Sequence, residues 1–188
     1  MMKEKYKQMK YLEYFFNEIT QFIQDDDIQI NKPIGITNEY KEMRRNGENE
    51  SHLCKLIRED SIEDFIIYVN KNDISLNTKI QLSIYETNSF ILKKEPTLIE
   101  YSAFYGSIQI FRYLYLNGSE TESTIWLYAI HGNNPELISF LENKSIKMPN
   151  NNYDEFLKES IKCHHTDLTN YILNKIDEYR YQNSYEKS

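Results

Sequence analysis

The sequence has 188 residues, a length that suits one compact domain or one short array of repeats. Lys and Arg number 22 against 29 Asp and Glu, and the net charge of −7 argues against a surface that binds nucleic-acid phosphates. Hydrophobic residues make up 40% of the chain, which is enough for a folded core. The 5 glycines lie too far apart to form the phosphate-binding loop of P-loop or dinucleotide enzymes.

Signals that would direct the chain out of the cytoplasm are missing from the sequence. The N-terminus has no apolar signal region, and no stretch approaches the roughly 18 apolar residues of a membrane span. Cys54 and Cys163 are too few for a disulfide framework, so we expect reduced thiols and a cytoplasmic protein. The N-terminal lysines beside an apolar stripe are compatible with an anionic membrane surface, but we favour a capping role for that stripe.

The first fifty residues are expected to cap the rest of the chain. Apolar residues recur at steps of three and four over residues 4–24, which predicts an amphipathic helix whose phenylalanines cover the open end of a helical stack. Asn38 can cap a second, short helix through Arg45 that Gly47 closes. We assign residues 1–50 to this capping helix and a linker.

From residue 51 onward the sequence repeats itself. Each copy has a short helical stretch, a turn, and a second helical stretch with paired apolar residues. The turns align at residues 60–65, 106–111 and 164–169, and residues 132–138 form a fourth copy with one extra residue. The spacings of 46, 26 and 32 residues are irregular, which a solenoid tolerates when the changes fall in loops. Residues 71–95 form an insertion, in which we expect a helix over residues 78–85.

One copy resembles the ankyrin repeat. It matches the pattern of that repeat at Thr97, Ile99, Ala103 and Gly106, and the pair Asn117-Gly118 falls where the repeat ends. In this register Gly106 ends the first helix with a positive φ, and the small Ala103 lets neighbouring helices approach closely.

A second copy, residues 125–132, matches the ankyrin pattern less well. It keeps Ala129 and Gly132 but has Trp126 where the repeat has His and Tyr128 where it has Ala, so we expect wider packing there. The chain also resembles an uncharacterised N-terminal domain of ankyrin-repeat proteins expanded in parasitic unicellular eukaryotes, and that resemblance implies no activity.

The predicted fold is therefore all-α: stacked helical hairpins that form an ankyrin-like solenoid with an N-terminal capping helix. The degenerate ankyrin-like repeats are expected over residues 51–176, and residues 177–188 form a polar tail.

The sequence presents no set of residues that meets the demands of catalysis or metal binding. Cys163, His164 and His165 are residue types that bind metals, but neighbouring helical residues point about 100° apart. No second Cys or His pair stands at ligand spacing, and His131 stands alone. A Cys–His nucleophile pair lacks a context for an oxyanion hole or an orienting third residue. We expect no catalytic residue, no metal and no cofactor, and therefore no enzyme.

The tyrosines indicate a partner-binding face. In the ankyrin-like register Tyr101 and Tyr105 lie one helical turn apart, and Leu127 and His131 take the corresponding places in the next copy. Because Tyr is enriched in interface cores, we expect these four side chains to form one patch that binds another protein. The predicted function is non-catalytic protein–protein interaction. The alternative is a structural domain that caps longer repeat proteins or self-associates, without a partner of its own.

Overall fold

The computed structural model describes residues 38–146, 148 and 153–185, and its regular elements are helices. They are α2 (Asn38–Asn46), α3 (His52–Arg58), α4 (Ile62–Lys71), α5 (Ser89–Lys94), α6 (Leu98–Tyr105), α7 (Ile108–Leu116), α8 (Ile125–Gly132), α9 (Pro135–Asn143), α10 (Tyr153–Lys162) and α11 (Thr166–Tyr185). No strand occurs in the described ranges, so the predicted all-α class is confirmed. The helix predicted over residues 4–24, with its capping role, lies outside the described residues.

The chain divides into two compact units. Residues 1–50 and 82–89 form the first unit, and residues 51–81 and 90–188 form the second. Helix α11 continues to Tyr185, past the point where the sequence places the start of a polar tail.

The described part of the first unit is built around the end of α2. Gly47 follows this helix with φ 67°, a left-handed conformation that suits glycine. Its carbonyl accepts hydrogen bonds from both the N–H and the hydroxyl of Thr87, each at 3.0 Å. Arg44 donates to the carbonyl of Ile84 at 3.5 Å. The short helix predicted from Asn38 and its closure by Gly47 are confirmed.

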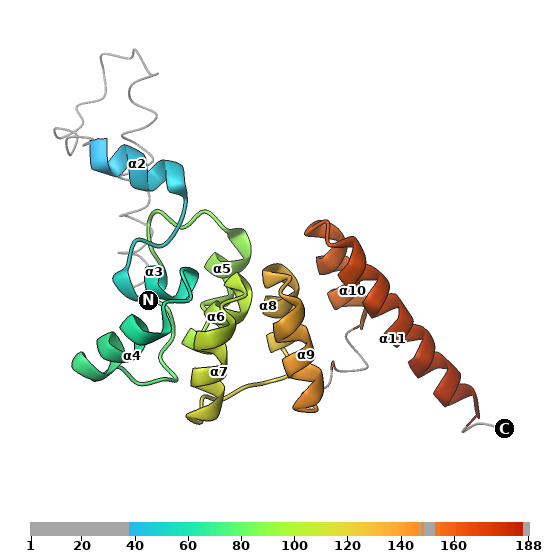
Figure 1. The fold of residues 1–188 in the computed structure, drawn as a ribbon. Coiled ribbons are helices and arrows are strands. Elements are labelled where there is room, and N and C mark those ends of the chain that lie inside the picture. The colour runs from blue at the N-terminus through green and yellow to red at the C-terminus, as the bar shows by residue number, and fades with distance from the viewer. Residues whose placement is uncertain (1–37, 147, 149–152, 186–188) are drawn as a thin grey trace, which may run out of the picture. The chain divides into compact units, whose positions relative to one another are not determined.

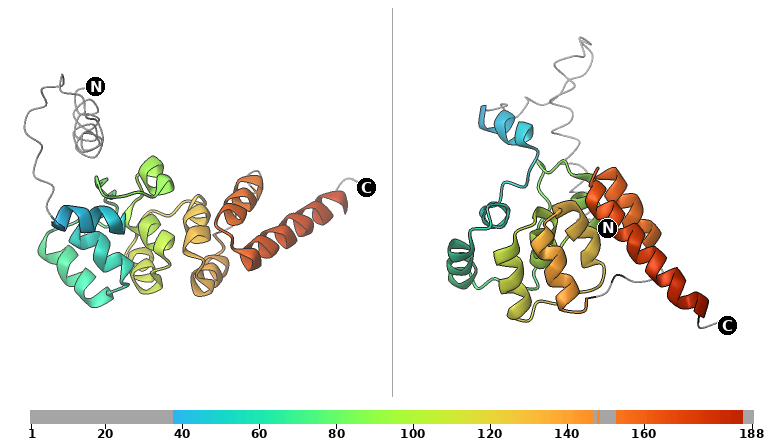
Figure 2. Two further views of the ribbon diagram at one scale, coloured as in Figure 1. Left: turned by 90° about the horizontal axis from the view of Figure 1, so that it is seen from above. Right: turned by 45° about the vertical axis from the view of Figure 1, so that its right-hand side comes forward.

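The described part of the second unit contains four helical hairpins, which follow one another along the chain (Figures 1 and 2). They are α3–α4, α6–α7, α8–α9 and α10–α11. The first helices contact one another in the order α3, α6, α8 and α10, and α4 contacts α7. Helices α6 and α8 are buried around most of their circumference, which is why they carry apolar residues at nearly every position. The core of this unit therefore runs between successive first helices.

A turn residue with a positive φ joins the two helices of each hairpin. Asp60, Gly106, Asn133 and His164 all have a positive φ, between 43° and 69°. At Gly106 its N–H donates to the Ala103 carbonyl at 3.2 Å, and the next residue bonds back across the turn; the turns at Asp60 and His164 have the same pattern. The predicted turns at residues 60, 106 and 164 are therefore confirmed.

The turn in the third hairpin differs from the prediction by one residue. Asn133, and not Gly132, has the positive φ, while Gly132 remains the last residue of α8. With Asn133 aligned to Gly106 the copy needs no extra residue. Asn is one of the few residues besides Gly that adopt this conformation readily, which explains why the shift is tolerated.

Polar side chains near these turns tie each hairpin to the next. The carboxylate of Asp60 accepts the N–H groups of Gln109 and Ile110, at the start of α7, each at 3.0 Å. Asn134 donates its side-chain amide to the Gly106 carbonyl at 2.7 Å and accepts the N–H of Glu136, at the start of α9. These bonds satisfy helix-end groups across hairpin boundaries and so fix the register of neighbouring hairpins.

The insertion between α4 and α6 does not contain the predicted helix over residues 78–85. Its chain is extended at Ile80, whose N–H donates to the Pro96 carbonyl at 2.7 Å, and Lys79 pairs with Thr97 in an isolated antiparallel bridge. Apolar residues alternate with polar ones over 78–84, a period that suits extended chain and not a helix. The helix in this insertion is α5 instead, and its Ile91 is fully buried.

Replacing Gly106 by valine should lower the free energy of unfolding by about 1–3 kcal/mol, because a β-branched residue is strained at φ 69°. A Cβ at this position would lie 3.0 Å from the Gly132 carbonyl oxygen and 3.2 Å from Asn134 Cβ. Chemical denaturation measures the loss. Gly118→Val separates strain from crowding: Gly118 also has a positive φ, but a Cβ added there would meet no atom within 4 Å apart from its chain neighbours, so its loss should be the smaller of the two. An unchanged stability of Gly106→Val would contradict the assigned turn.

Candidate functional site

The four residues of the predicted partner patch do not form an exposed surface. Tyr101 is 0% exposed and Leu127 is 4% exposed, while Tyr105 and His131 are half-buried. Arg58 donates a hydrogen bond to the Tyr101 hydroxyl at 3.1 Å, and burial raises the pKa of this tyrosine well above its ordinary value. Tyr101 and Leu127 therefore belong to the core between first helices.

The insertion also covers part of the predicted face. The ring of Phe90, on α5, lies 5.9 Å from that of Phe104, 5.1 Å from Tyr128 and 4.4 Å from His131. Phe104 is itself only 9% exposed. The chain's own α5 thus occupies the side of α6 and α8 that an ankyrin-like register leaves for a partner. Sequence reasoning missed this because it placed the helix of the insertion at residues 78–85.

The structure brings His131 close to Glu159, on α10, and to Cys163, which directly follows α10. Its Nε2 lies 3.0 Å from Glu159 Oε1, and its Nδ1 lies 3.4 Å from Cys163 Sγ. Glu159 and Cys163 are four residues apart, and the Cys163 N–H donates to the Glu159 carbonyl, so both side chains leave the same face of one helical turn. Lys162 donates to the other Glu159 oxygen at 3.0 Å. We call these three residues, His131, Glu159 and Cys163, the α8–α10 cluster.

The surroundings of the α8–α10 cluster favour neutral forms of its thiol and imidazole. Burial lowers the pKa of His131, although the Glu159 carboxylate acts in the opposite direction. Burial and the same carboxylate raise the pKa of Cys163. A carboxylate only accepts hydrogen bonds, so Nε2 of His131 donates to it and Nδ1 accepts the thiol hydrogen. The three groups form a hydrogen-bonded thiol–imidazole–carboxylate chain, and they also offer three ligand atoms for a cation.

The expectation that His131 stands alone is wrong. Its partners are 28 and 32 residues away in the sequence, and only the packing of α8 against α10 brings them close. The four-residue spacing of Glu159 and Cys163, which puts both on one side of a helix, was the one local sign of this cluster. It indicates a site only when the residue that faces them from the neighbouring helix is known. His164 lies at the turn that follows, with φ 59°.

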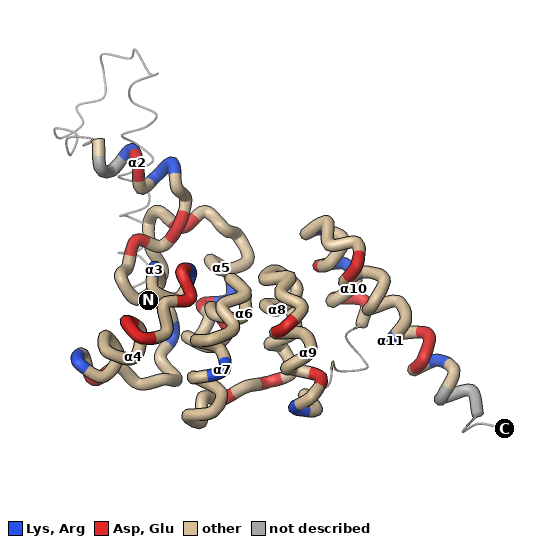
Figure 3. Tube along the Cα trace, in the orientation of Figure 1, with Lys and Arg blue, Asp and Glu red and all other residues tan. Residues whose placement is uncertain are grey.

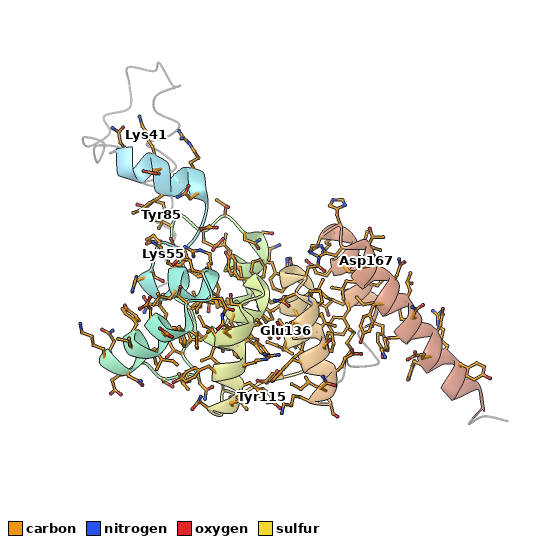
Figure 4. All side chains as sticks on the ribbon, viewed as in Figure 1. Lys41, Lys55, Tyr85, Tyr115, Glu136 and Asp167 are labelled. Atoms are coloured by element: carbon orange, nitrogen blue, oxygen red, sulfur yellow. The ribbon has the colours of Figure 1, made fainter. Side chains whose placement is uncertain are left out.

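A second candidate is an exposed cluster on the second helices α7 and α9. We call it the α7–α9 surface and define it as Arg112, Tyr115, Leu116, Phe140 and Lys144. Leu116 is 72% exposed, the rings of Tyr115 and Phe140 are half-buried 5.3 Å apart, and the Lys144 ammonium lies 5.7 Å from the Phe140 ring centre. Figure 4 labels Tyr115 on α7 and Glu136 on α9; Glu136 pairs with Arg112 at 2.8 Å.

A pocket of about 250 Å³ lies between the third and fourth hairpins. Its lining residues are Trp126, Glu142, Ser145, Ile146, Met148, Tyr153, Tyr171 and Lys175. The polar groups of this lining already bind one another: Tyr171 donates to Glu142 at 2.5 Å, and the Trp126 indole donates to the Ile146 carbonyl at 2.7 Å. The pocket is therefore explained by the packing of α10–α11 on the preceding hairpin.

Comparison of the chain with family models, with curated proteins and with solved structures found no match. In the described part of the chain, every helix is too short or too polar to cross a membrane.

Proposed function

We propose that the protein is a non-catalytic protein-interaction module built on an ankyrin-like array of helical hairpins. The observation that carries the proposal is the recurrence of a positive-φ turn residue, at Asp60, Gly106, Asn133 and His164, in four successive hairpins. Repeats that contact only their neighbours produce an elongated surface, and proteins built in this way commonly use that surface to bind others. Cys54 and Cys163 are not joined by a disulfide, which supports a site of action in the cytoplasm, where thiols stay reduced.

The α7–α9 surface supports this proposal as the place where a partner binds. Aromatic rings and arginine are among the residues that contribute most at the centres of protein interfaces, and the exposed Leu116 adds apolar area to this surface. The cations beside the rings favour a partner that presents an apolar side chain next to a carboxylate. Figure 3 shows acidic and basic residues interspersed along the helices of the second unit, so recognition is expected to depend on this local arrangement and not on one charged face.

The position of Cys163 supports a non-catalytic role for the α8–α10 cluster. The thiol follows the last residue of α10, where the negative end of the helix dipole disfavours a thiolate. Reactive cysteines are typically found in the opposite setting, at helix N-termini, where the thiolate is stabilised.

Capture of partners by the immobilised full chain from an extract of the producing cells tests the proposal. Leu116→Asp should reduce capture of a specific polypeptide by about 10-fold or more, because a charge replaces an exposed apolar side chain of the proposed surface. Ile67→Asp is the matched control, since Ile67 is 63% exposed on α4 and lies outside that surface. Far-UV circular dichroism should show the same helix content for all three chains. Equal capture by both variants would contradict the assigned surface.

The second candidate function, a cap or self-associating domain, is favoured by a different observation. Helix α11 ends the described array and exposes Leu173 and Tyr181, at 42% and 64%, which are eight residues apart and so lie on one side of the helix. Such a face suits a further hairpin or a second copy of the chain. Sedimentation of the full chain separates the two functions. A monomer is expected for the interaction module, whereas a dimer that Leu173→Asp dissociates would support the cap.

A further inference from the structure

We propose that the α8–α10 cluster binds a divalent transition-metal ion of borderline softness, with Zn²⁺ as the prototype. His131, Glu159 and Cys163 each offer one ligand atom, and these atoms all lie within 4.8 Å of one another. Zinc bonds of about 2.0–2.3 Å to nitrogen, oxygen and sulfur place the ligand atoms of a tetrahedral site only a little closer together than this. One ring nitrogen of His131 is the ligand, so the side chain of Glu159 or Cys163 that faces the other nitrogen must turn toward the cation to close the site.

The backbone holds the three ligands in place before a cation binds. Two of them come from one turn at the end of α10, and the third comes from α8, which packs against α10. The ring of His131 packs against two aromatic side chains, with ring centres 4.4 Å from Phe90 and 4.7 Å from Phe104. A ligand whose orientation is already fixed loses little conformational entropy when the metal binds.

The chemistry of the donors selects the kind of ion. A thiolate, an imidazole and a carboxylate suit Zn²⁺, whereas Ca²⁺ and Mg²⁺ require oxygen ligands only. Binding releases the thiol proton of Cys163 to solvent, and the two negative charges of thiolate and carboxylate then balance the charge of the ion. Lys162 remains bonded to the second oxygen of Glu159 and holds this side chain in position. Three protein ligands leave a fourth place for water.

The site would connect the third hairpin to the fourth. His131 belongs to α8, Glu159 belongs to the last turn of α10, and Cys163 directly follows that turn. A bound ion therefore joins two first helices that otherwise meet through side-chain packing. Because the ion binds the folded chain and not the unfolded one, metal raises the thermal midpoint in proportion to the logarithm of its concentration.

The test is titration of the reduced full chain with Co²⁺ and then Zn²⁺. We expect one Co²⁺ per chain, a thiolate-to-cobalt charge-transfer band in the near ultraviolet, displacement of Co²⁺ by Zn²⁺, and a raised thermal midpoint. Cys163→Ser should abolish the band, and Glu159→Gln should weaken binding by about 10-fold or more. Cys54→Ala and Glu155→Gln are the matched controls: Cys54 is the buried thiol of α3, and Glu155 is an exposed carboxylate one turn earlier on α10.

The outcomes separate clearly. Loss of the band in Cys163→Ser with its retention in Cys54→Ala supports the site, provided that circular dichroism shows both variants to be folded. His131→Gln, which should also lose the band, serves as the second ligand variant if Cys163→Ser fails to fold. Failure of the wild-type chain to bind Co²⁺, or a band that persists in Cys163→Ser, would overturn the proposal.

Discussion

Replacement of Gly132 by valine is expected to lower the free energy of unfolding by about 3 kcal/mol or more, the largest effect of any single glycine substitution in the second unit. A Cβ on Gly132 would lie 2.3 Å from the Ala103 carbonyl oxygen and 2.8 Å from the Gly106 backbone nitrogen. Both are backbone atoms, so a side chain at this position forces α6 and α8 apart. Urea denaturation measures the loss.

Gly118→Val provides the comparison for this substitution. Gly118 has φ 85° but open space around it, so the variant reports conformational strain without a clash between helices. The loss at Gly132 should clearly exceed the loss at Gly118. If the two losses were equal, the close approach of α6 and α8 would not be a determinant of stability.

The second large effect is expected at Tyr101. Tyr101→Ala should destabilise the fold by about 3 kcal/mol or more, because it removes a fully buried ring from the core between α3 and α6. Tyr101→Phe keeps the ring and loses only the hydroxyl that accepts from Arg58, so its loss should be about 1 kcal/mol. Thermal and chemical denaturation of the two variants measure both values.

Partner capture distinguishes packing from binding at this residue. Tyr101→Phe should capture the partner as the wild-type chain does, since Tyr101 is inaccessible in the folded state. A variant Tyr101→Ala that kept full stability but lost capture would show that the side chain acts in binding and would contradict its assignment to the core.

The sequence predicted features that depend on a few neighbouring residues. Gly106 has the expected positive φ, and Gly47 closes its short helix as expected, because glycine adopts a left-handed conformation without strain. The shift of the third turn from Gly132 to Asn133 also has a local origin. Both Gly and Asn adopt a positive φ readily, so the sequence alone does not decide which of these two neighbours forms the turn. Gly132 was singled out correctly but for another reason, since it permits the close approach of two helices.

Features that depend on contacts between distant residues were not predicted. The ankyrin-like register placed Tyr101 on an open face, yet the face of α6 and α8 is occupied by neighbouring helices and by Phe90 of the insertion. Whether an aromatic residue lies in a core or at an interface depends on what covers it, and periodicity alone does not contain that information. The approach of Cys163 to His131 was missed for the same reason.

Hydroxyl-radical footprinting of the chain with its captured partner tests the central claim, that the array binds another protein through the α7–α9 surface. The account predicts that oxidation of Leu116, Tyr115 and Phe140 falls when the partner is added, while oxidation of the exposed Ile67 on α4 is unchanged. Protection that appears instead on Leu173 and Tyr181 of α11, or an unchanged pattern throughout the chain, would contradict it.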